Sequence, residues 1–161
     1  WAASQPFYRH GAHRRLGYAS VEAYVEQAWL PAYSRHDPRD LIAMLDVWLA
    51  NDLGQAWRHW TTTLPPQAEA AEPGATGSEP VAGLPADLAA ALAGIRARSC
   101  VIAGSHDLYF PPDDCAAEAG LIPDSRFVVL ESELGHRAGN PRDAPLEQAL
   151  IRAEVELLCR D

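Results

Sequence analysis

CVIAGSHDLYFPP, residues 100–112, is the stretch that decides the fold of this chain. Its apolar run, residues 101–103, predicts a strand buried on both faces, because strands of that kind are continuously apolar rather than alternating. The polar turn that follows carries His106 and Asp107. Open α/β sheets bind their ligands beyond the carboxyl ends of their strands. Asp107 is therefore the first candidate functional residue.

A second apolar run, residues 126–130 (RFVVL), predicts another strand, and Gly135 and His136 follow it. Residues 113–119 predict a short helix between the two strands. Because a strand, a helix and a strand joined by short connections form a right-handed crossover, the two strands should be parallel. Neighbouring parallel strands lie about 4.8 Å apart. The side chains of Asp107 and His136 are therefore expected within hydrogen-bonding distance.

Asp107 and His136 have the chemistry of two members of a catalytic triad. A carboxylate bonded to one ring nitrogen of a histidine fixes its tautomer and stabilises the imidazolium when the other nitrogen takes a proton. Either residue alone is more often a structural turn residue, but their joint placement after successive strands favours a function. His106 has no second partner placed by the sequence. Asp113 and Asp114 fit the start of a helix, where anions are favourable.

The nucleophile of such a triad is missing from the sequence. Triads with the chain order nucleophile, acid, histidine carry the nucleophile in a G-x-S-x-G turn between strand and helix. No serine and none of the three cysteines lies in that frame. Ser105 follows Gly104 after the first strand, but no second glycine follows it. The chain also begins at Trp1 rather than methionine, so we expect it to be part of a longer protein.

Two helices are predicted near the front of the chain. Ser20 caps the first, whose apolar positions extend to Trp29, and Pro31 ends it. Asp37 and Pro38 begin the second, which stops near residues 51–54. The second helix has one apolar stripe, made of Leu41, Ile42, Leu45, Trp48 and Leu49.

Large aromatic side chains are frequent in this front region: Tyr24, Trp29, Tyr33, Trp48, Trp57 and Trp60. Their helical spacing favours a core between helices. The alternative is a lid whose inner wall touches an apolar substrate.

The composition divides the chain into three segments. Residues 1–60 form the helical front, residues 61–85 are a proline- and alanine-rich linker or insertion, and residues 86–161 form the α/β part. The last segment is predicted to open with a helix whose apolar stripe is made of Leu84, Leu88, Leu92 and Ile95. It ends with a helix capped by Asp143, with Pro145 in its first turn and the stripe Leu146, Ala149, Leu150, Ala153 and Leu157.

Charge and cysteine content exclude several classes of function. The net charge of -9 and the pI near 5.0 argue against a nucleic-acid groove and against docking on anionic lipid. No apolar run approaches the roughly 20 residues that a membrane helix needs, and no signal-peptide pattern opens the chain. The three cysteines have no metal-ligand spacing, so neither a metal site nor a cofactor is expected. A cytoplasmic location fits best.

The segments GIRARSCVIAGSHDLYFPPDD and SRFVVLESELGHRAGNP resemble the carboxyl-terminal part of an α/β-hydrolase, and more narrowly the homoserine O-acetyltransferase-like branch. In that branch a "DPNDLL" segment lies in the helical lid, matched here by residues 37–42. A turn of the type D-x-x-F-P carries the catalytic Asp, matched by Asp107 with residues 110–111. A G-H turn carries the catalytic His, matched by Gly135 and His136.

The resemblance implies the last two parallel strands of the hydrolase sheet with their flanking helices, preceded by the helical lid. It also implies a serine nucleophile, a two-step acyl-enzyme mechanism and no metal. Its partners would be a small-molecule acyl donor, with acyl-CoA as one candidate, and an amino-acid hydroxyl as acceptor. The histidine turn continues with Arg137 rather than an acidic residue, which favours an acetyltransferase-like hydrolase over a true homoserine acetyltransferase.

Three functional hypotheses follow. The chain is the acid-and-histidine part of an acyltransferase or esterase, inactive by itself; or a non-catalytic domain that binds a partner through its aromatic front; or a half that complements a separate amino-terminal half. A homodimer is a further possibility, because a two-stranded sheet leaves open edges. The first hypothesis is preferred.

Overall fold

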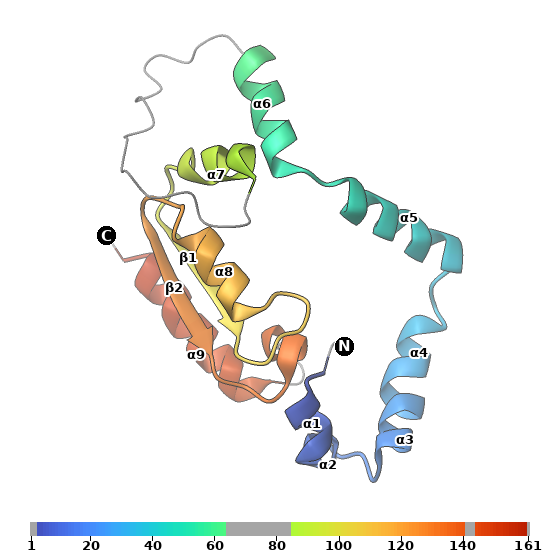
Figure 1. The fold of residues 1–161 in the computed structure, drawn as a ribbon. Helices are drawn as coiled ribbons and strands as arrows, with labels where there is room; N and C mark the ends of the chain where they lie inside the picture. Colours follow the sequence, from blue (N-terminus) through green and yellow to red (C-terminus); the bar gives the residue numbers. More distant parts are fainter. Residues whose placement is uncertain (1–2, 64–84, 141–143, 161) are drawn as a thin grey trace. The chain divides into compact units, whose positions relative to one another are not determined.

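The computed structural model of the chain describes residues 3–63, 85–140 and 144–160 (Figure 1). The described residues form two units. One contains residues 3–51, 102–112, 128–140 and 144–160; the other contains residues 52–63, 85–101 and 113–127. These units are not the three segments expected from composition, whose boundaries stay predictions. The predicted linker falls largely on residues 64–84, outside the described residues.

The sheet has two strands, β1 (Ser99–Gly104) and β2 (Ser125–Leu130), joined in sequence through α8 (Pro112–Ala119). The Ser99 amide donates to the Asp124 carbonyl at 2.8 Å, and the Ser105 amide donates to the Leu130 carbonyl at 3.0 Å. The residue numbers of both strands rise together from the first of these bonds to the second, so the strands are parallel. Their arrows point the same way in Figure 1. This part of the fold is as predicted.

The first two helices, α1 (Gln5–Arg9) and α2 (Ala12–Arg15), were not foreseen in the polar opening of the chain. Ser4 caps α1 by accepting a hydrogen bond from the Phe7 amide at 3.1 Å. Pro6 lies in the first turn of α1, where its missing N–H costs nothing. The short helix pattern is interrupted at Gly11, whose positive φ of 64° breaks the run between α1 and α2.

The next helix begins as predicted but does not end at Pro31. Ser20 caps α3 (Val21–Tyr24), and the Ala23 amide donates to its hydroxyl at 3.1 Å. A π-helical turn, η1 (Val25–Trp29), follows, and α4 (Leu30–Tyr33) continues through the proline. The Leu30 amide bonds to the Val25 carbonyl, five residues back. Such a wide turn offers room for a proline ring inside a helix, which the sequence rule does not anticipate.

Helix α5 (Pro38–Ala50) has the predicted start, with Asp37 accepting a hydrogen bond from the Arg39 amide at 2.9 Å. Its side chains do not form a core. No residue of α5 is buried, and Trp48 is 67% exposed. The favoured interpretation of the front aromatics as core is therefore wrong for α5, because helical spacing defines an apolar face without supplying a neighbour for it. It holds for Tyr24, which is fully buried.

The core of the larger unit joins the front of the chain to its end. Phe7 and Tyr24 are its largest buried side chains, and their ring centroids lie 5.2 Å apart. They pack with buried residues of β2 and of the segment after it: Leu130, Leu134, Ala138 and Ala144. The amino-terminal helices are therefore a structural support for the segment that follows β2.

Helix α9 (Pro145–Leu158) begins after Ala144, which gives no side-chain cap. The predicted cap, Asp143, lies outside the described residues. All five residues of the predicted stripe are exposed, Leu146 most of all at 79%. Instead Ile151 packs against the core, and Gln148 donates to the Gly139 carbonyl at 3.0 Å. Helix α9 therefore presents its more polar side, and not this stripe, to the described residues.

In the smaller unit, α6 (Leu53–Thr63) packs on α7 (Ala86–Ala93). A Cβ at Gly94 would lie 2.4 Å from the Trp57 ring, so this close packing needs glycine. Arg58 also forms an ion pair with Asp87. Helix α7 was predicted and α6 was not; residues 61–63, assigned to the linker, are helical. The stripe residue Leu84 lies outside the described residues.

Among the described helices, none has the length and apolar character needed to cross a membrane. The cytoplasmic location and the small-molecule partners expected from the sequence stay predictions.

Candidate active site

The acid turn begins directly after β1. The Asp107 amide donates to the Gly104 carbonyl at 3.0 Å. The Oδ1 atom of Asp107 accepts hydrogen bonds from the Tyr109 amide at 2.8 Å and the Phe110 amide at 3.1 Å. An aspartate that binds amides two and three residues ahead is locked by its own backbone. The second oxygen, Oδ2, is thereby held in a fixed direction.

The histidine turn is the 3-10 helix η2 (Gly135–Gly139), which follows β2. Gly135 has a φ of +60°, in the left-handed region that favours glycine. A Cβ there would lie 2.8 Å from the Ser4 amide nitrogen and 3.2 Å from the His106 carbonyl oxygen. Backbone therefore closes on Gly135 from two sides, which explains why glycine precedes His136.

The two turns bring the predicted pair together. The Nδ1 atom of His136 lies 2.9 Å from Oδ2 of Asp107. Because a carboxylate can only accept, Nδ1 is the donor, and the remaining ring nitrogen, Nε2, is left as the basic atom of the neutral imidazole. The expected proximity of the two side chains is confirmed.

Burial and ring contacts fix the pair further. The Asp107 side chain is only 9% exposed, whereas that of His136 is 40% exposed. The Tyr109 ring meets the imidazole edge-on at 4.9 Å between centroids, and the Phe110 ring lies at 5.5 Å. The carboxylate is thus shielded while the histidine remains accessible. This combination suits a proton-accepting ring that needs a stable orientation and an open side.

His106 has a different place, as expected. Its Nδ1 atom lies 3.1 Å from the Ser132 carbonyl oxygen and 3.0 Å from the Ser105 hydroxyl. The Ser105 hydroxyl in turn accepts from the Ser132 amide at 3.2 Å. Ser132 donates its own hydroxyl to Glu147 at 2.6 Å. The bond between Ser132 and Ser105 links the acid turn to the segment after β2 without His106, whose ring bonds to neither Asp107 nor His136. Asp113 and Asp114 lie in the first turn of α8, as predicted.

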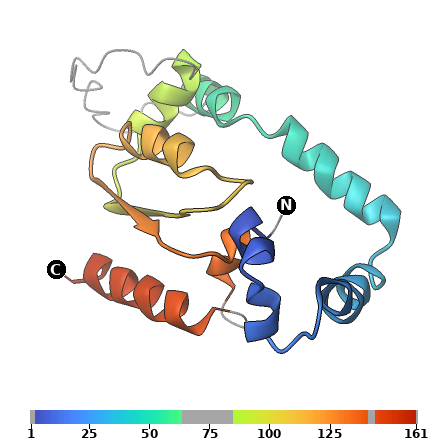
Figure 2. The same cartoon turned by 60° about the horizontal axis from the view of Figure 1, so that its bottom comes forward.

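The amino-terminal helices hold the segment before the histidine turn. The Ser4 hydroxyl donates to the Glu133 carbonyl oxygen. The Glu133 carboxylate binds Arg15 at 2.6 Å and His10 at 2.5 Å. Hydrogen bonds from Arg15, and then from His10, lower the pKa of the Glu133 carboxyl below its ordinary value. Figure 2 shows α1 and α2 beside the histidine turn.

These supporting contacts could not be predicted from the sequence. Ser4 and Glu133 are 129 positions apart in sequence, so no local pattern connects them. The one available signal was Ser4 followed by Pro6, which marks a capped helix start.

Other candidate chemistry is limited. Among the described residues, no serine hydroxyl forms a hydrogen bond with His136, and Ser105 contacts His106 instead. The described ranges also hold no group of three or more His, Cys, Asp and Glu side chains placed to bind a metal ion.

The chain resembles known esterases over most of its length. No protein-family model matches it. An ethyl acetate hydrolase of Pseudomonas veronii is 32% identical over 155 residues, which are 96% of this chain and 37% of that protein. A probable esterase of Corynebacterium glutamicum is 34% identical over 139 residues, 84% of this chain and 32% of that protein.

Solved structures agree with the sequence relatives. The acetyl esterase MekB matches 98% of this chain and 38% of its own, with a TM-score of 0.71 and 30% identity. An acetylester hydrolase from Corynebacterium glutamicum matches 91% and 37%, with a TM-score of 0.64 and 27% identity. The fold is the carboxyl-terminal part of an α/β-hydrolase. This is the fold class that the sequence predicted, with two parallel strands, flanking helices and a helical lid region.

The chain spans only about a third of the length of these relatives, between 32% and 38%. A shorter match also exists with a probable acyltransferase of Methanothermobacter thermautotrophicus, 42% identical over 55 residues, which are 34% of this chain and 17% of that protein. The relatives matched over most of the chain are esterases, so the homoserine O-acetyltransferase-like branch expected from the sequence stays a prediction.

Proposed function

We propose that this chain supplies the acid, Asp107, and the general base, His136, of a serine-dependent hydrolase that cleaves short acyl esters. The observation that supports this is the 2.9 Å contact between Asp107 Oδ2 and His136 Nδ1. Its setting at the carboxyl ends of two parallel strands is where an α/β-hydrolase keeps these groups. Relatives described as an ethyl acetate hydrolase and an acetyl esterase favour acetyl esters as substrates.

The mechanism follows from the tautomer that Asp107 imposes. With Nδ1–H donated to the carboxylate, Nε2 of His136 accepts the proton of a serine hydroxyl as its oxygen attacks the ester carbonyl. The imidazolium so formed is stabilised by Asp107 and gives that proton to the departing alcohol. The same nitrogen then takes a proton from water, which attacks the acyl-enzyme, and returns it to the serine as the carboxylic acid leaves.

The serine belongs to polypeptide outside these 161 residues in this proposal, because no G-x-S-x-G frame occurs in the chain. The chain alone is therefore expected to be inactive and to remain unlabelled by a fluorophosphonate probe. Labelling of the isolated chain would contradict this assignment.

A chimera provides the direct test. The matching segment of the Pseudomonas veronii ethyl acetate hydrolase is replaced with this chain, and ethyl acetate hydrolysis is measured. Changing His136→Ala or Asp107→Asn in the chimera should lower kcat by about a thousandfold or more, because the serine loses its base or the base its correct tautomer.

His106→Ala is the matched control, since this histidine precedes Asp107 but does not contact His136. It should retain most of the activity. A chimera that hydrolyses ethyl acetate equally well with His136→Ala, or loses as much with His106→Ala, would refute the assigned roles.

An acyltransferase is the second candidate, favoured by the 42% identity to a probable acyltransferase over 55 residues and by the acetyltransferase-like motifs of the sequence. The acid and the histidine would act identically, and only the acceptor of the acyl group would differ. Feeding the chimera acetyl-CoA and homoserine separates the two: O-acetylhomoserine identifies a transferase, whereas acetate alone identifies a hydrolase.

A further inference from the structure

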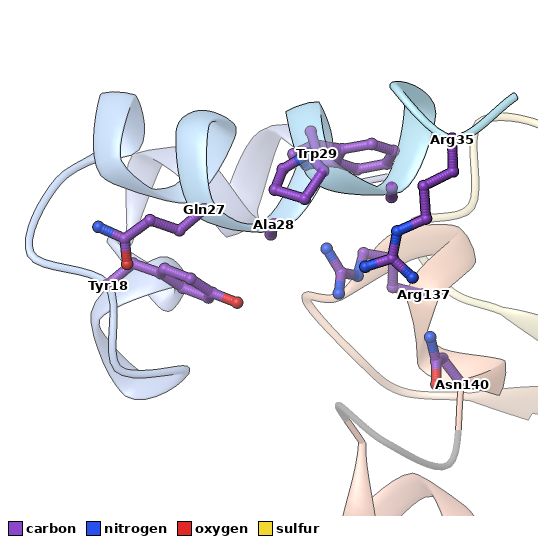
Figure 3. A pocket seen from close by; sticks show the side chains of 9 residues that line it. Tyr18, Gln27, Ala28, Trp29, Arg35, Arg137 and Asn140 are labelled. Carbon is purple, nitrogen blue, oxygen red and sulfur yellow. The ribbon is translucent and has the colours of Figure 1, made fainter.

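A cavity of about 420 Å³ lies in the larger unit, next to the histidine turn (Figure 3). Trp29, Ala28 and Pro31 give it an apolar wall. Arg35, Arg137 and Asn140 bring polar groups to it. Neither Asp107 nor His136 lines the cavity, although Arg137 follows His136 in the histidine turn. Binding in this cavity does not require the proposed ester hydrolysis.

Two guanidinium groups converge on this cavity from distant parts of the sequence. Figure 3 shows the side chains of Arg35 and Arg137 turned toward the same space, with the Asn140 amide beneath them. None of the described residues that line it is acidic. The oxygens of one anion can bridge two guanidinium groups that face the same space. The arrangement contrasts with the net charge of the chain, which is -9.

Arg137 is held in place before any ligand arrives. Its guanidinium donates to the hydroxyl of the fully buried Tyr24. Its Cζ atom lies 5.3 Å from the centroid of the Tyr24 ring and 5.5 Å from that of Trp29. Burial raises the pKa of the Tyr24 hydroxyl, which keeps it neutral as an acceptor. A planar guanidinium fixed against two aromatic rings loses little further freedom when it binds an oxyanion.

Part of the cavity wall comes from a π-helical turn. Gln27, Ala28 and Trp29 line the cavity and all belong to the π-helical turn η1. Such turns are rare and often occur at functional sites, because the extra residue redirects side chains that an ordinary helix would place elsewhere. The Trp29 ring is further fixed by stacking on Tyr33, with 5.6 Å between centroids and 10° between planes.

We propose that this cavity binds a small organic anion, whose carboxylate or phosphate oxygens contact Arg35 and Arg137 and whose apolar body packs on Trp29. Guanidinium groups bind both kinds of oxyanion through paired hydrogen bonds. A cavity of about 420 Å³ has room for such a ligand.

Calorimetric titration of the whole chain tests the proposal with three probes that share a four-carbon body: butyrate, monobutyl phosphate and 1-butanol. At least one anion should bind saturably and should bind more weakly at high salt, while 1-butanol should not bind comparably. The tighter of the two anions identifies the preferred head group. Absence of binding by both anions, or equal binding of 1-butanol, would overturn the proposal.

Arg35→Gln locates the site, because Arg35 lines the cavity, is exposed and lies outside the hydrophobic core. It should weaken binding of the preferred anion by about tenfold to a hundredfold, as expected for one lost charge-assisted contact. Arg14→Gln removes the same charge outside the cavity and should leave binding unchanged. Circular dichroism confirms that both variants are folded, and an Arg35→Gln variant that binds like the parent would refute the site.

Discussion

The histidine turn and helix α5 belong to the same unit. They differ in how much of each is packed against distant parts of the chain. The histidine turn is enclosed by Ser4, Phe7 and Tyr24 on the amino-terminal helices and by the Asp107 carboxylate. In α5 the local signals are as good, with an aspartate cap and a clear apolar stripe, yet no residue is buried. The histidine turn is therefore held in place by residues that are far from it in the sequence. A regular helix such as α5 can form from local signals without such contacts.

The largest expected effect lies in the core behind the histidine turn. Phe7→Ala removes a ring that is fully buried and packed on Tyr24, so we expect a loss of about 3–5 kcal/mol in the free energy of unfolding. Urea denaturation measures it. The neighbouring Tyr8→Ala is the control, because Tyr8 is 39% exposed and should cost far less. Similar losses for both variants would mean that Phe7 does not support the turn.

The next effect concerns the backbone of the turn itself. Gly135→Ala places a Cβ at a φ of +60° and 2.8 Å from the Ser4 nitrogen. We expect a loss of about 1–3 kcal/mol, the range for a strained backbone that cannot relax. Gly139→Ala in the same 3-10 helix is matched to it, since a Cβ there meets nothing within 4 Å. Thermal unfolding compares the two, and equal melting temperatures would contradict the predicted crowding.

The contacts of the Glu133 carboxylate with Arg15 and His10 predict that the free energy of unfolding depends on pH. The folded-state pKa of Glu133 lies below its ordinary value of 4.5 because Arg15 and His10 bind the charged form. The unfolded chain therefore takes up this proton first, so the stabilisation is present above about pH 4.5 and is lost as the pH falls through the folded pKa. Glu133→Gln should flatten the stability curve in that acid range.

Glu131→Gln is the control for this pH effect, because Glu131 is exposed on the same segment. It should leave the acid limb of the stability curve as it is in the parent. A Glu133→Gln variant whose stability falls with acid as steeply as the parent's would show that these contacts of Glu133 contribute nothing.

The smallest effect is expected in α5. Trp48→Gln removes a large apolar side chain that is 67% exposed, so the free energy of unfolding should change by no more than about 0.5 kcal/mol. Chemical denaturation of this variant and of Phe7→Ala compares the smallest and the largest expected losses in the free energy of unfolding. A loss of several kcal/mol for Trp48→Gln would mean that α5 is covered in solution.

Much of the site was accessible to sequence reasoning because its signals are local. The strand after residue 99, the turn at Asp107 and the glycine before His136 each follow from a few neighbouring residues. Their meeting then follows from the direction of a parallel crossover. The caps at Ser20 and Asp37 were predictable for the same reason, since a side chain and an amide two or three residues on decide them.

The predictions that were wrong or missing concern features that local signals do not specify. The aromatic face of α5 was interpreted as core, because periodicity identifies an apolar face and assumes a neighbour for it. Pro31 was read as a helix end, but the π turn before it lets the helix continue. The supports at Ser4 and Glu133 connect segments 129 positions apart, and no pattern within one segment encodes such a contact.

By itself, the sequence determined the two candidate catalytic residues, an aspartate and a histidine after two successive strands, and many of the caps and turns that begin its elements. Only the tertiary structure decided which side chains are buried, which turn needs its glycine, and that two arginines from opposite ends of the chain share one cavity. The physical reason is that hydrogen bonds within a turn are set by neighbours along the chain, whereas burial and charge pairing depend on which distant segments meet.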